Sequence, residues 1–190
     1  MSRGRILSVL GIFVVGGLAG LVVAGVTASF VGYTNKLEFC ISCHEMQSTV
    51  YQEYKKTAHF QNQFGVRAVC ANCHVPHHSW IAMMLRKMRA TVDEIPNHFM
   101  GTLDTPEKFE AHRLKLAKRV WAHYESDDSR ECRSCHVREA MLLKEQRTSA
   151  RTAHEGAVKD GKTCIDCHKG ITHKLPEGMK KEEAPKDFTF

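Results

Sequence analysis

The sequence of 190 residues has no cysteine outside four short units. Each unit reads Cys-x-x-Cys-His: Cys40, Cys43 and His44; Cys70, Cys73 and His74; Cys132, Cys135 and His136; Cys164, Cys167 and His168. A disulfide framework, a zinc site or a thiol redox centre would give no reason for a histidine directly after every second cysteine. The pattern is that of covalent c-type haem attachment, and it predicts four haems.

Charge is absent from Ile6–Gly32, a run of 27 positions. About 20 apolar residues suffice to span a bilayer, whereas the apolar region of a cleaved signal peptide has about 7–15. The run therefore predicts a retained transmembrane anchor. Arg3 and Arg5 precede it, and the positive-inside tendency then places the N-terminus in the cytoplasm and the remaining chain in the periplasm, at the inner membrane.

Apolar residues are few in the rest of the chain, since the mean hydropathy is −0.33 even with the anchor included. Beyond residue 32 there are 190 − 32 = 158 residues, or about 40 for each haem, so the macrocycles must form most of the core. No stretch reads convincingly as a strand. The fold class expected is mainly α with extensive loops, with a single N-terminal transmembrane helix in 1–32, a multihaem cytochrome c domain in 33–176 and a disordered tail in 177–190.

The formal net charge of +6 does not predict a nucleic-acid partner. Each haem carries two propionates, so up to eight negative charges oppose the basic excess. Lysine and arginine are expected to pair with propionates and solvent, and we expect no nucleic acid among the partners.

The four units form an internal repeat. Thr57-Ala58-His59 precedes Cys70, and Thr152-Ala153-His154 precedes Cys164; the first two units start 30 residues apart and the last two 32 apart. This spacing predicts two duplicated dihaem modules. It also predicts the same task for His59 and His154, and the task we expect is iron ligation on the face opposite a motif histidine.

Eight histidines lie outside the units: His59, His77, His78, His98, His112, His123, His154 and His173. His77 and His78 follow His74 too closely to reach the same iron, but they could serve another. His112 and His123 lie on a predicted helix face directed at the core. For each histidine the alternative is a hydrogen bond to a propionate or carbonyl group, and spacing alone assigns none of them.

Several helices are expected. Ser48–Phe60 is one, and Ser79–Asp93 is a mixed apolar and basic helix that either lies at a membrane surface or covers haems, with Pro96 ending it. Thr105 and Pro106 predict the start of a helix that runs to about Tyr124. A short helix is expected over 139–148.

Small residues recur every fourth position in the anchor, at Gly16, Gly20, Ala24 and Ala28. Such stripes allow close packing of transmembrane helices, although small residues are common in these helices in any case. A homo-oligomer is therefore a candidate assembly.

The sequence resembles the NapC/NirT family of membrane-anchored tetrahaem cytochromes c over about Ile6–Pro176. The resemblance rests on four stretches: Cys-Ile-Ser-Cys-His-Glu-Met at 40–46, Gly-Val-Arg at 65–67, Cys-His-Val-Pro at 73–76 and Gly-Thr-Leu-Asp-Thr-Pro-Glu-Lys-Phe-Glu-Ala-His-Arg at 101–113. It implies four covalently bound haems c and a quinol dehydrogenase that takes electrons from menaquinol or ubiquinol. The electrons would pass to a periplasmic reductase. Nitrate reductase is favoured over nitrite reductase, because the NrfH-type members of the family are shorter than this chain.

The resemblance also implies iron ligands. Met46 rather than His44 would ligate the first iron, whose other face would be open or lightly occupied next to the quinol, although the residues alone leave the choice between Met46 and His44 open. The distal ligands implied for the second, third and fourth irons are His173, His59 and His154. Some family assignments place a ligand near His77, so His77, His78 and His112 stay open.

Lys87 and Asp93 match the family's quinol pocket by position. A carboxylate near the quinol hydroxyl can accept a proton, and a lysine can hold the ring oxygen and favour the charged carboxylate. On a regular helix these two residues lie about 120° apart, so Glu94 is a rival for the role of the carboxylate.

Three other functions are compatible with the units. A pure electron relay with no quinol site would leave all four irons six-coordinate, and the chain could also donate to a nitrite reductase or another periplasmic reductase. A terminal reductase would need a catalytic pocket that the sequence does not indicate. A haem sensor or scaffold is disfavoured because no signalling domain is appended.

Overall fold

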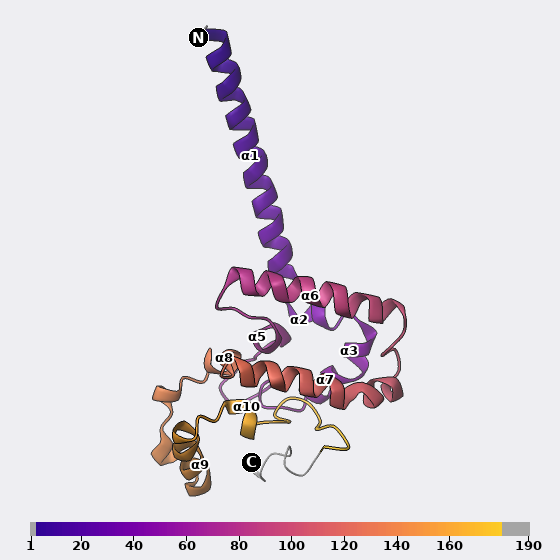
Figure 1. The fold of residues 1–190 in the computed structure, drawn as a ribbon, viewed down its shortest axis with the longest axis vertical. Helices are drawn as coiled ribbons and strands as arrows, with labels where there is room; N and C mark the ends of the chain where they lie inside the picture. The colour runs from indigo at the N-terminus through magenta and orange to yellow at the C-terminus, as the bar shows by residue number, and fades with distance from the viewer. Residues whose placement is uncertain (1–2, 180–190) are drawn as a thin grey trace.

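The computed structural model describes residues 3–179 and is built of helices and loops, with no strand in that range (Figure 1). This confirms the expected fold class. The α-helices are α1 Arg3–Tyr33, α2 Leu37–Cys40, α3 His44–Ser48, α4 Val50–Tyr54, α5 Cys70–His74, α6 Trp80–Phe99, α7 Pro106–Ser126, α8 Arg130–Arg133, α9 Thr148–Lys159 and α10 Cys164–Cys167. The tail expected from residue 177 lies outside the described residues from residue 180 onward.

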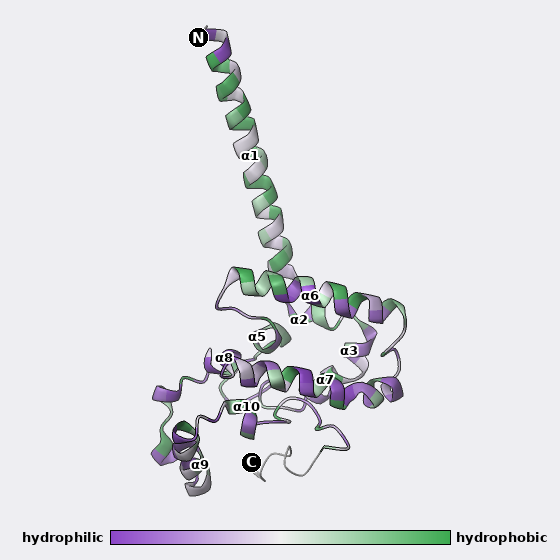
Figure 2. Cartoon of the chain, viewed as in Figure 1, coloured by the Kyte–Doolittle hydropathy of each residue, from purple (hydrophilic) through white to green (hydrophobic). Residues whose placement is uncertain are grey.

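Helix α1 stands away from the rest of the molecule as a single apolar rod (Figures 1 and 2). Its 31 residues are long and apolar enough to cross a membrane by length and composition. Of these residues only Val31, at the end that meets the domain, is buried. The helix thus offers its whole apolar surface to its surroundings, as a membrane anchor does.

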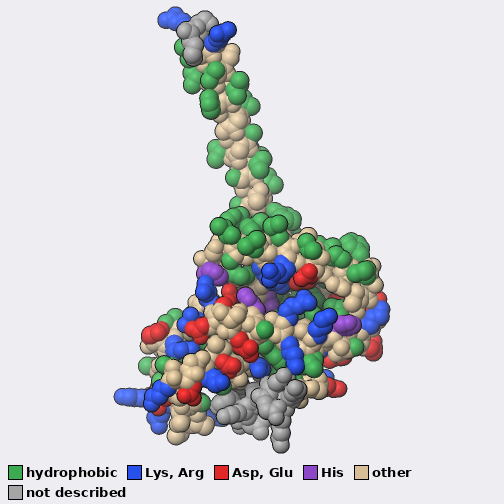
Figure 3. Space-filling view, in the orientation of Figure 1, with side chains coloured by type: hydrophobic (Ala, Val, Ile, Leu, Met, Phe, Trp, Pro, Cys, Tyr) green, Lys and Arg blue, Asp and Glu red, His purple; other side chains and the backbone are tan. Residues whose placement is uncertain are grey.

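Helix α6 lies across the end of α1 (Figure 1). It begins after Ser79, whose side-chain oxygen accepts a hydrogen bond from the backbone N–H of Ala82, and none of its residues is buried. Six exposed apolar side chains follow one another at helical spacing along one face: Ile81, Leu85, Met88, Val92, Ile95 and Phe99. Figure 3 shows hydrophobic side chains gathered where the domain meets α1.

The predicted end of this helix at Pro96 was wrong. Pro96 lies inside the last turn of α6, and the helix continues to Phe99, where Met100 N–H donates to the carbonyl of Pro96 at 2.9 Å. Proline has no backbone N–H, so Pro96 removes one hydrogen bond of the helix. Because Pro96 lies in the last turn, the loss of this one bond does not end α6. The extra turn carries His98.

Two other expected helices differ from those observed. The helix expected over Ser48–Phe60 is shorter and broken, because α3 ends at Ser48, α4 ends at Tyr54, and Thr49 between them leaves helical geometry with φ −116° and ψ −95°. The Thr49 hydroxyl donates instead to the carbonyl of Glu45. In place of a helix over 139–148 there are two 3-10 turns, Arg138–Ala140 and Leu143–Glu145, and α9 begins only at Thr148.

Helix α7 begins where the sequence predicted it. The hydroxyl of Thr105 accepts a hydrogen bond from Lys108 N–H at 3.3 Å, and Pro106 is the first helical residue. Tyr124, buried near the other end, donates its hydroxyl to the carbonyl of Cys73 at 2.5 Å. This bond joins α7 to the second Cys-x-x-Cys-His unit.

The side-chain core is small for a domain of this length. Among residues 3–179 the buried apolar side chains are Val31, Leu37, Tyr54, Ala71, Phe109, Tyr124 and Ile165, together with Pro76 and Pro176. Such a core alone would be marginal for a domain of this size. It fits the prediction that the haems supply most of the buried apolar surface.

Candidate haem-binding site

The four Cys-x-x-Cys-His units follow one another through space in chain order, starting at α1. Helix α2 of the first unit packs against α5 of the second, and α5 packs against α8 of the third. The fourth unit joins the third through Ser129, whose hydroxyl accepts a hydrogen bond from Ile165 N–H at 3.2 Å. All eight cysteines are free thiols, so each pair can form two thioether bonds.

Three motif histidines each face a second histidine. Two imidazoles on one metal, with metal–nitrogen bonds of about 2 Å, hold their ring centres about 6 Å apart. The observed distances between ring centres are 6.2 Å for His74–His173, 6.1 Å for His136–His59 and 5.9 Å for His168–His154. The structure therefore brings together all three pairs that the family resemblance implied.

The two histidines of the repeat reach different modules. His154 faces His168 of its own module, whereas His59, which precedes the second unit, faces His136 of the third. The repeat predicted that both would face a motif histidine, but similarity between two segments carries no information on which unit each one meets.

Burial keeps several of these rings neutral. It lowers the pKa of His74 to about 4, helped by the neighbouring His173, and it also lowers the pKa values of His59, His168 and His173. A neutral imidazole has a free nitrogen lone pair, which is the form that binds a metal.

Hydrogen bonds fix which nitrogen faces the partner ring. His154 Nδ1 lies 2.7 Å from Oε1 of Gln146, which leaves Nε2 available. By contrast, Nε2 of His77 lies 2.9 Å from the carbonyl oxygen of Ala71, and Nδ1 of His112 lies 2.8 Å from that of Lys108. Within residues 3–179, neither His77 nor His112 makes a ring contact with a motif histidine.

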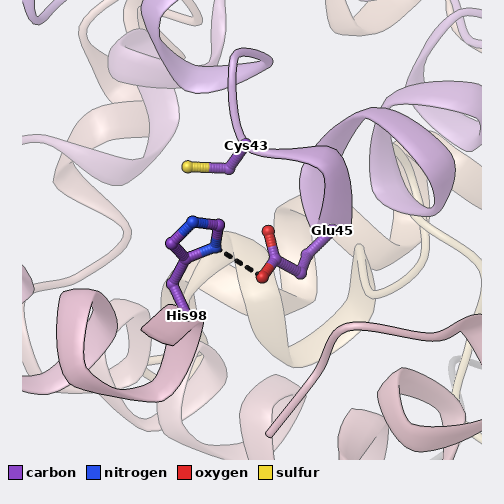
Figure 4. A group of neighbouring side chains, drawn as sticks. All are labelled: Cys43, Glu45 and His98. Carbon is purple, nitrogen blue, oxygen red and sulfur yellow. Dashed lines mark hydrogen bonds and ion pairs between the residues drawn. The ribbon is translucent and has the colours of Figure 1, made fainter. Parts of the chain in front are cut away.

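The first unit has a histidine pair of its own, which the sequence did not indicate. The ring of His44, the first residue of α3, lies 5.6 Å from that of His98 in the last turn of α6, with 53° between the ring planes. Figure 4 shows His98 beside Cys43 and Glu45, with Nδ1 of His98 2.6 Å from Oε1 of Glu45. No spacing rule relates residue 98 to the first unit, because the contact depends on the path of α6.

Lys87 lies where α1, α6 and the first unit meet. Its ammonium group donates a hydrogen bond to the hydroxyl of Thr34, just after α1, at 2.7 Å, and Asn35 Nδ2 lies 3.7 Å from Sδ of Met83. Burial lowers the pKa of Lys87, although the thiol of Cys40 opposes the shift. Lys87 is thus close to both the expected membrane surface and the first haem attachment site.

Asp93 does not interact with Lys87. Its carboxylate is half-exposed, and Oδ2 lies 3.9 Å from Nη1 of Arg119 on α7. Glu94, the rival carboxylate, is paired with Arg86 at 3.0 Å on the exposed side of α6. Among the described residues no bond joins Lys87 to either carboxylate.

Comparison with known proteins agrees with this arrangement of units and anchor. A family model described as "NapC/NirT cytochrome c family, N-terminal region" matches residues 3–178. The chain belongs to the NapC/NirT cytochrome c family.

Curated relatives share this family's pattern over most of the chain. The chain is 51% identical over 173 residues to the "Denitrification system component NirT" of Stutzerimonas stutzeri, covering 91% of this chain and 85% of that protein. It is 48% identical over 171 residues to the "Cytochrome c-type protein NapC" of Escherichia coli K12, covering 90% and 84%. With the "Cytochrome c-type protein TorC" of the same strain, identity is 43% over 184 residues, covering 95% of this chain and 46% of TorC. No solved structure matches.

Membership of the NapC/NirT family makes the chain a membrane-anchored c-type cytochrome of electron transfer, and it implies covalently bound haem c. The residues present fit that cofactor. The eight free thiols stand in four Cys-x-x-Cys pairs, and the motif histidines of the second, third and fourth units each have a second imidazole at a distance that suits a shared iron.

Proposed function

We propose that this cytochrome is a tetrahaem quinol dehydrogenase of the inner membrane, with its haem domain in the periplasm. It oxidises membrane quinol and delivers the electrons to a periplasmic reductase. The observation that carries the proposal is the position of Lys87, between the end of the apolar helix α1, the exposed apolar face of α6 and the first unit.

The apolar face of α6 supports contact with the bilayer. Exposed apolar side chains at helical spacing, next to the end of a spanning helix, are expected to enter the boundary between lipid headgroups and acyl chains. Trp80 at the start of α6, 52% exposed, suits the same boundary, because tryptophan is enriched at membrane interfaces. Of the two alternatives for this segment, we therefore propose that it lies at the membrane surface.

Lys87 is suited to hold the quinol ring oxygen. Its hydrogen bond to Thr34 fixes the ammonium group at the level where a quinol headgroup would arrive from the bilayer. Quinol oxidation releases two protons, and Asp93 is the proposed acceptor because its half-exposed carboxylate can pass a proton to solvent. The two residues then act on different atoms of the quinol, which agrees with the absence of a direct bond between them.

The proposed haem-binding residues are the eight cysteines Cys40, Cys43, Cys70, Cys73, Cys132, Cys135, Cys164 and Cys167. The residues that would hold the second, third and fourth irons are His74 with His173, His136 with His59 and His168 with His154, and His44 or Met46 would hold the first. Bound haem would supply one-electron redox chemistry, so a quinol, which gives up two electrons, would be oxidised in two successive steps. The order of the units, from α1 outward, supports delivery to a partner on the far side of the domain.

Nitrate reductase is the proposed partner, because the segment 101–113 resembles the longer members of the family. Donation to a nitrite reductase or another reductase is the alternative. The proposed organisation keeps the anchor at 1–32 and the haem domain at 33–176, and the small-residue stripe of α1 would mediate any homo-oligomer.

The test is reduction of the full-length protein in liposomes by a menaquinol or ubiquinol analogue, followed by haem absorption. Lys87→Ala should slow reduction by about tenfold or more, because quinol loses its hydrogen-bond partner. Lys115→Ala, an exposed lysine on α7, is the matched control and should not slow it. Both variants should still be fully reduced by dithionite. If quinol reduces no haem in the wild type while dithionite does, the chain is a relay without a quinol site.

A further inference from the structure

Three side chains that can bind a metal ion meet where α7 ends and α8 begins. His123 lies in the last turn of α7, Asp127 follows that helix, and Glu131 is the second residue of α8. One ligand atom from each side chain lies within 4.8 Å of the other two, and Nε2 of His123 is 3.8 Å from Oδ2 of Asp127. The proposed haem and quinol sites use none of these three residues.

Glu131 is the buried member of this cluster. It is 6% exposed, and its Oε2 atom is buried without a hydrogen bond to any residue in 3–179. A buried carboxylate oxygen with no partner has lost its hydration and gained no interaction in exchange, which is costly. The atom therefore needs a positively charged or donor group on the side where His123 and Asp127 lie.

Asp127 brings a second carboxylate to Glu131 instead of a donor. Oδ1 of Asp127 accepts a hydrogen bond from the backbone N–H of Arg130 at 3.4 Å, and Oδ2 faces His123. Burial raises the pKa of Glu131, and the negative charge of Asp127 raises it further, because two neighbouring carboxylates disfavour each other's ionisation. A cation held between the two carboxylates would replace this repulsion with attraction.

The arginines of this segment do not supply that cation. They pair with Asp128, whose carboxylate lies 2.8 Å from Arg133 and 3.9 Å from Arg138. Within residues 3–179, no lysine or arginine pairs with Asp127 or Glu131. The two carboxylates therefore have the imidazole of His123 as their neighbour and no permanent positive charge.

The donor set indicates the class of ion. One imidazole and two carboxylates suit zinc and neighbouring divalent transition metals, whereas magnesium and calcium prefer oxygen ligands alone. Zinc–nitrogen and zinc–oxygen bonds of about 2.0–2.2 Å allow two ligand atoms on one ion to lie up to about 4 Å apart. The 3.8 Å between His123 and Asp127 fits this limit, and the exposed side chain of His123 can rotate toward Glu131.

We propose that His123, Asp127 and Glu131 bind one divalent transition-metal ion, with zinc as the best-suited ion and solvent completing its coordination. The ion has a structural role, since it joins the end of α7 to the start of α8. This site is separate from the haem irons, and the proposal depends neither on quinol oxidation nor on the identity of the reductase.

The position of the site shows what the ion would stabilise. Tyr124, next to His123, donates its hydrogen bond to the second Cys-x-x-Cys-His unit, and the residue after Glu131 is the first cysteine of the third unit. Ser129, in the loop between the ligands, accepts the hydrogen bond from the fourth unit. The ion would therefore hold together a junction that contacts three of the four units.

The first measurement uses the full-length, detergent-solubilised protein with its four covalently bound haems, after a chelator has removed loosely bound metal. Isothermal titration calorimetry with zinc chloride measures stoichiometry and affinity, and thermal unfolding measures the effect of zinc on stability. We expect one tightly bound zinc ion per chain, a higher unfolding midpoint with zinc, and no displacement by excess magnesium or calcium. A wild type that binds no zinc, or whose midpoint zinc does not raise, overturns the proposal.

Two substitutions identify the ligands. His123→Ala and Asp127→Asn should each weaken zinc binding about tenfold or more, because losing even a residue that only supports a ligand reduces metal affinity by about 10–100-fold. His112→Ala, an exposed histidine of the same helix that bonds to the carbonyl of Lys108, is the matched control and should bind zinc as the wild type does. Equal zinc affinity in all three variants would place the ion on other surface histidines and overturn the proposal.

Glu131→Gln distinguishes a bound ion from a proton shared by the two carboxylates. The amide keeps the size of the side chain and can donate a hydrogen bond to Asp127, so it replaces a shared proton but not a metal ligand. Under the proposal, zinc no longer raises the unfolding midpoint of this variant. A rise in Glu131→Gln equal to that in the wild type would show that Glu131 is not a ligand, and a shared proton would then explain the pair.

Discussion

The ring of His59 lies 6.1 Å from that of His136, although His59 belongs by sequence to the first dihaem module and His136 to the second. His173 makes the complementary contact. It follows the fourth unit, in the second module, and its ring lies 6.2 Å from that of His74 in the second unit, which belongs to the first module. Each module therefore supplies a histidine that faces a motif histidine of the other module.

This exchange predicts a specific result for paired substitutions. His59→Ala and His173→Ala should each convert one haem to high spin, and the double variant should convert two, because the histidines serve different irons. Spin counting by electron paramagnetic resonance measures all three. A double variant with a single high-spin haem would place both histidines on one iron, and His78→Ala, an exposed histidine, serves as the control.

Arg113 is predicted to be needed for the stability of the haem domain. It is 5% exposed, and its guanidinium group bonds to the carboxylates of Glu53 and Glu110 and to the carbonyl of Lys174, next to His173. Arg113→Ala leaves the half-buried Glu53 without its partner, and removing one member of a buried pair costs about 3–5 kcal/mol, less where solvent reaches it. We expect a clear fall in the thermal unfolding midpoint, and Lys115→Ala on the same helix should not shift it.

Acid should weaken the same network. Hydrogen bonds from Arg113 lower the pKa of Glu110, and burial opposes the shift only in part. A carboxyl group with a lowered pKa in the folded state stabilises that state above its ordinary pKa, and the contribution is lost as the pH falls through the lowered value. The difference in unfolding midpoint between wild type and Glu110→Gln should therefore be present at neutral pH and shrink in acid. A difference that is the same at every pH would contradict this role of the charge.

Ser129 is predicted to hold the third and fourth units together. It is fully buried, has a left-handed backbone with φ 49°, and accepts the hydrogen bond from Ile165 N–H. Ser129→Ala leaves that buried N–H without a partner, at a cost of about 1–3 kcal/mol. Ser129→Gly loses the same bond but relieves the backbone, so it should be the less destabilised of the two in thermal unfolding.

The exposed face of α6 is predicted to matter for quinol and not for the haems. Leu85→Glu places a charge on the face proposed to meet lipid, so quinol-dependent reduction in liposomes should fall several-fold while dithionite reduction is unchanged. Leu142→Glu, an exposed leucine in the loop after the third unit, is the control. Equal rates in the two variants would remove the case for membrane contact by α6.

The sequence predicted much of the fold because its strongest signals are local. The spacing of Cys40, Cys43 and His44 specifies a haem unit within five residues, and Thr105 with Pro106 specifies a helix start. The contact of His98 with the first unit was not predicted, because Pro96 was expected to end α6 and the turn that carries His98 lies beyond Pro96. The partner of His59 could not be predicted, because a contact between modules depends on how whole helices pack and leaves no pattern near the residue itself.

Helix α6 lies across the foot of α1, to which Lys87 and Met83 connect it. A single transmembrane helix anchors a domain to the membrane but does not fix the orientation of the domain relative to the bilayer. Under the proposed contact of α6 with lipid, the domain would still diffuse laterally in the membrane, but its tilt would be fixed. The surface of the domain that faces away from the membrane would then keep one orientation. A soluble reductase would always encounter that surface at the same distance from the lipid.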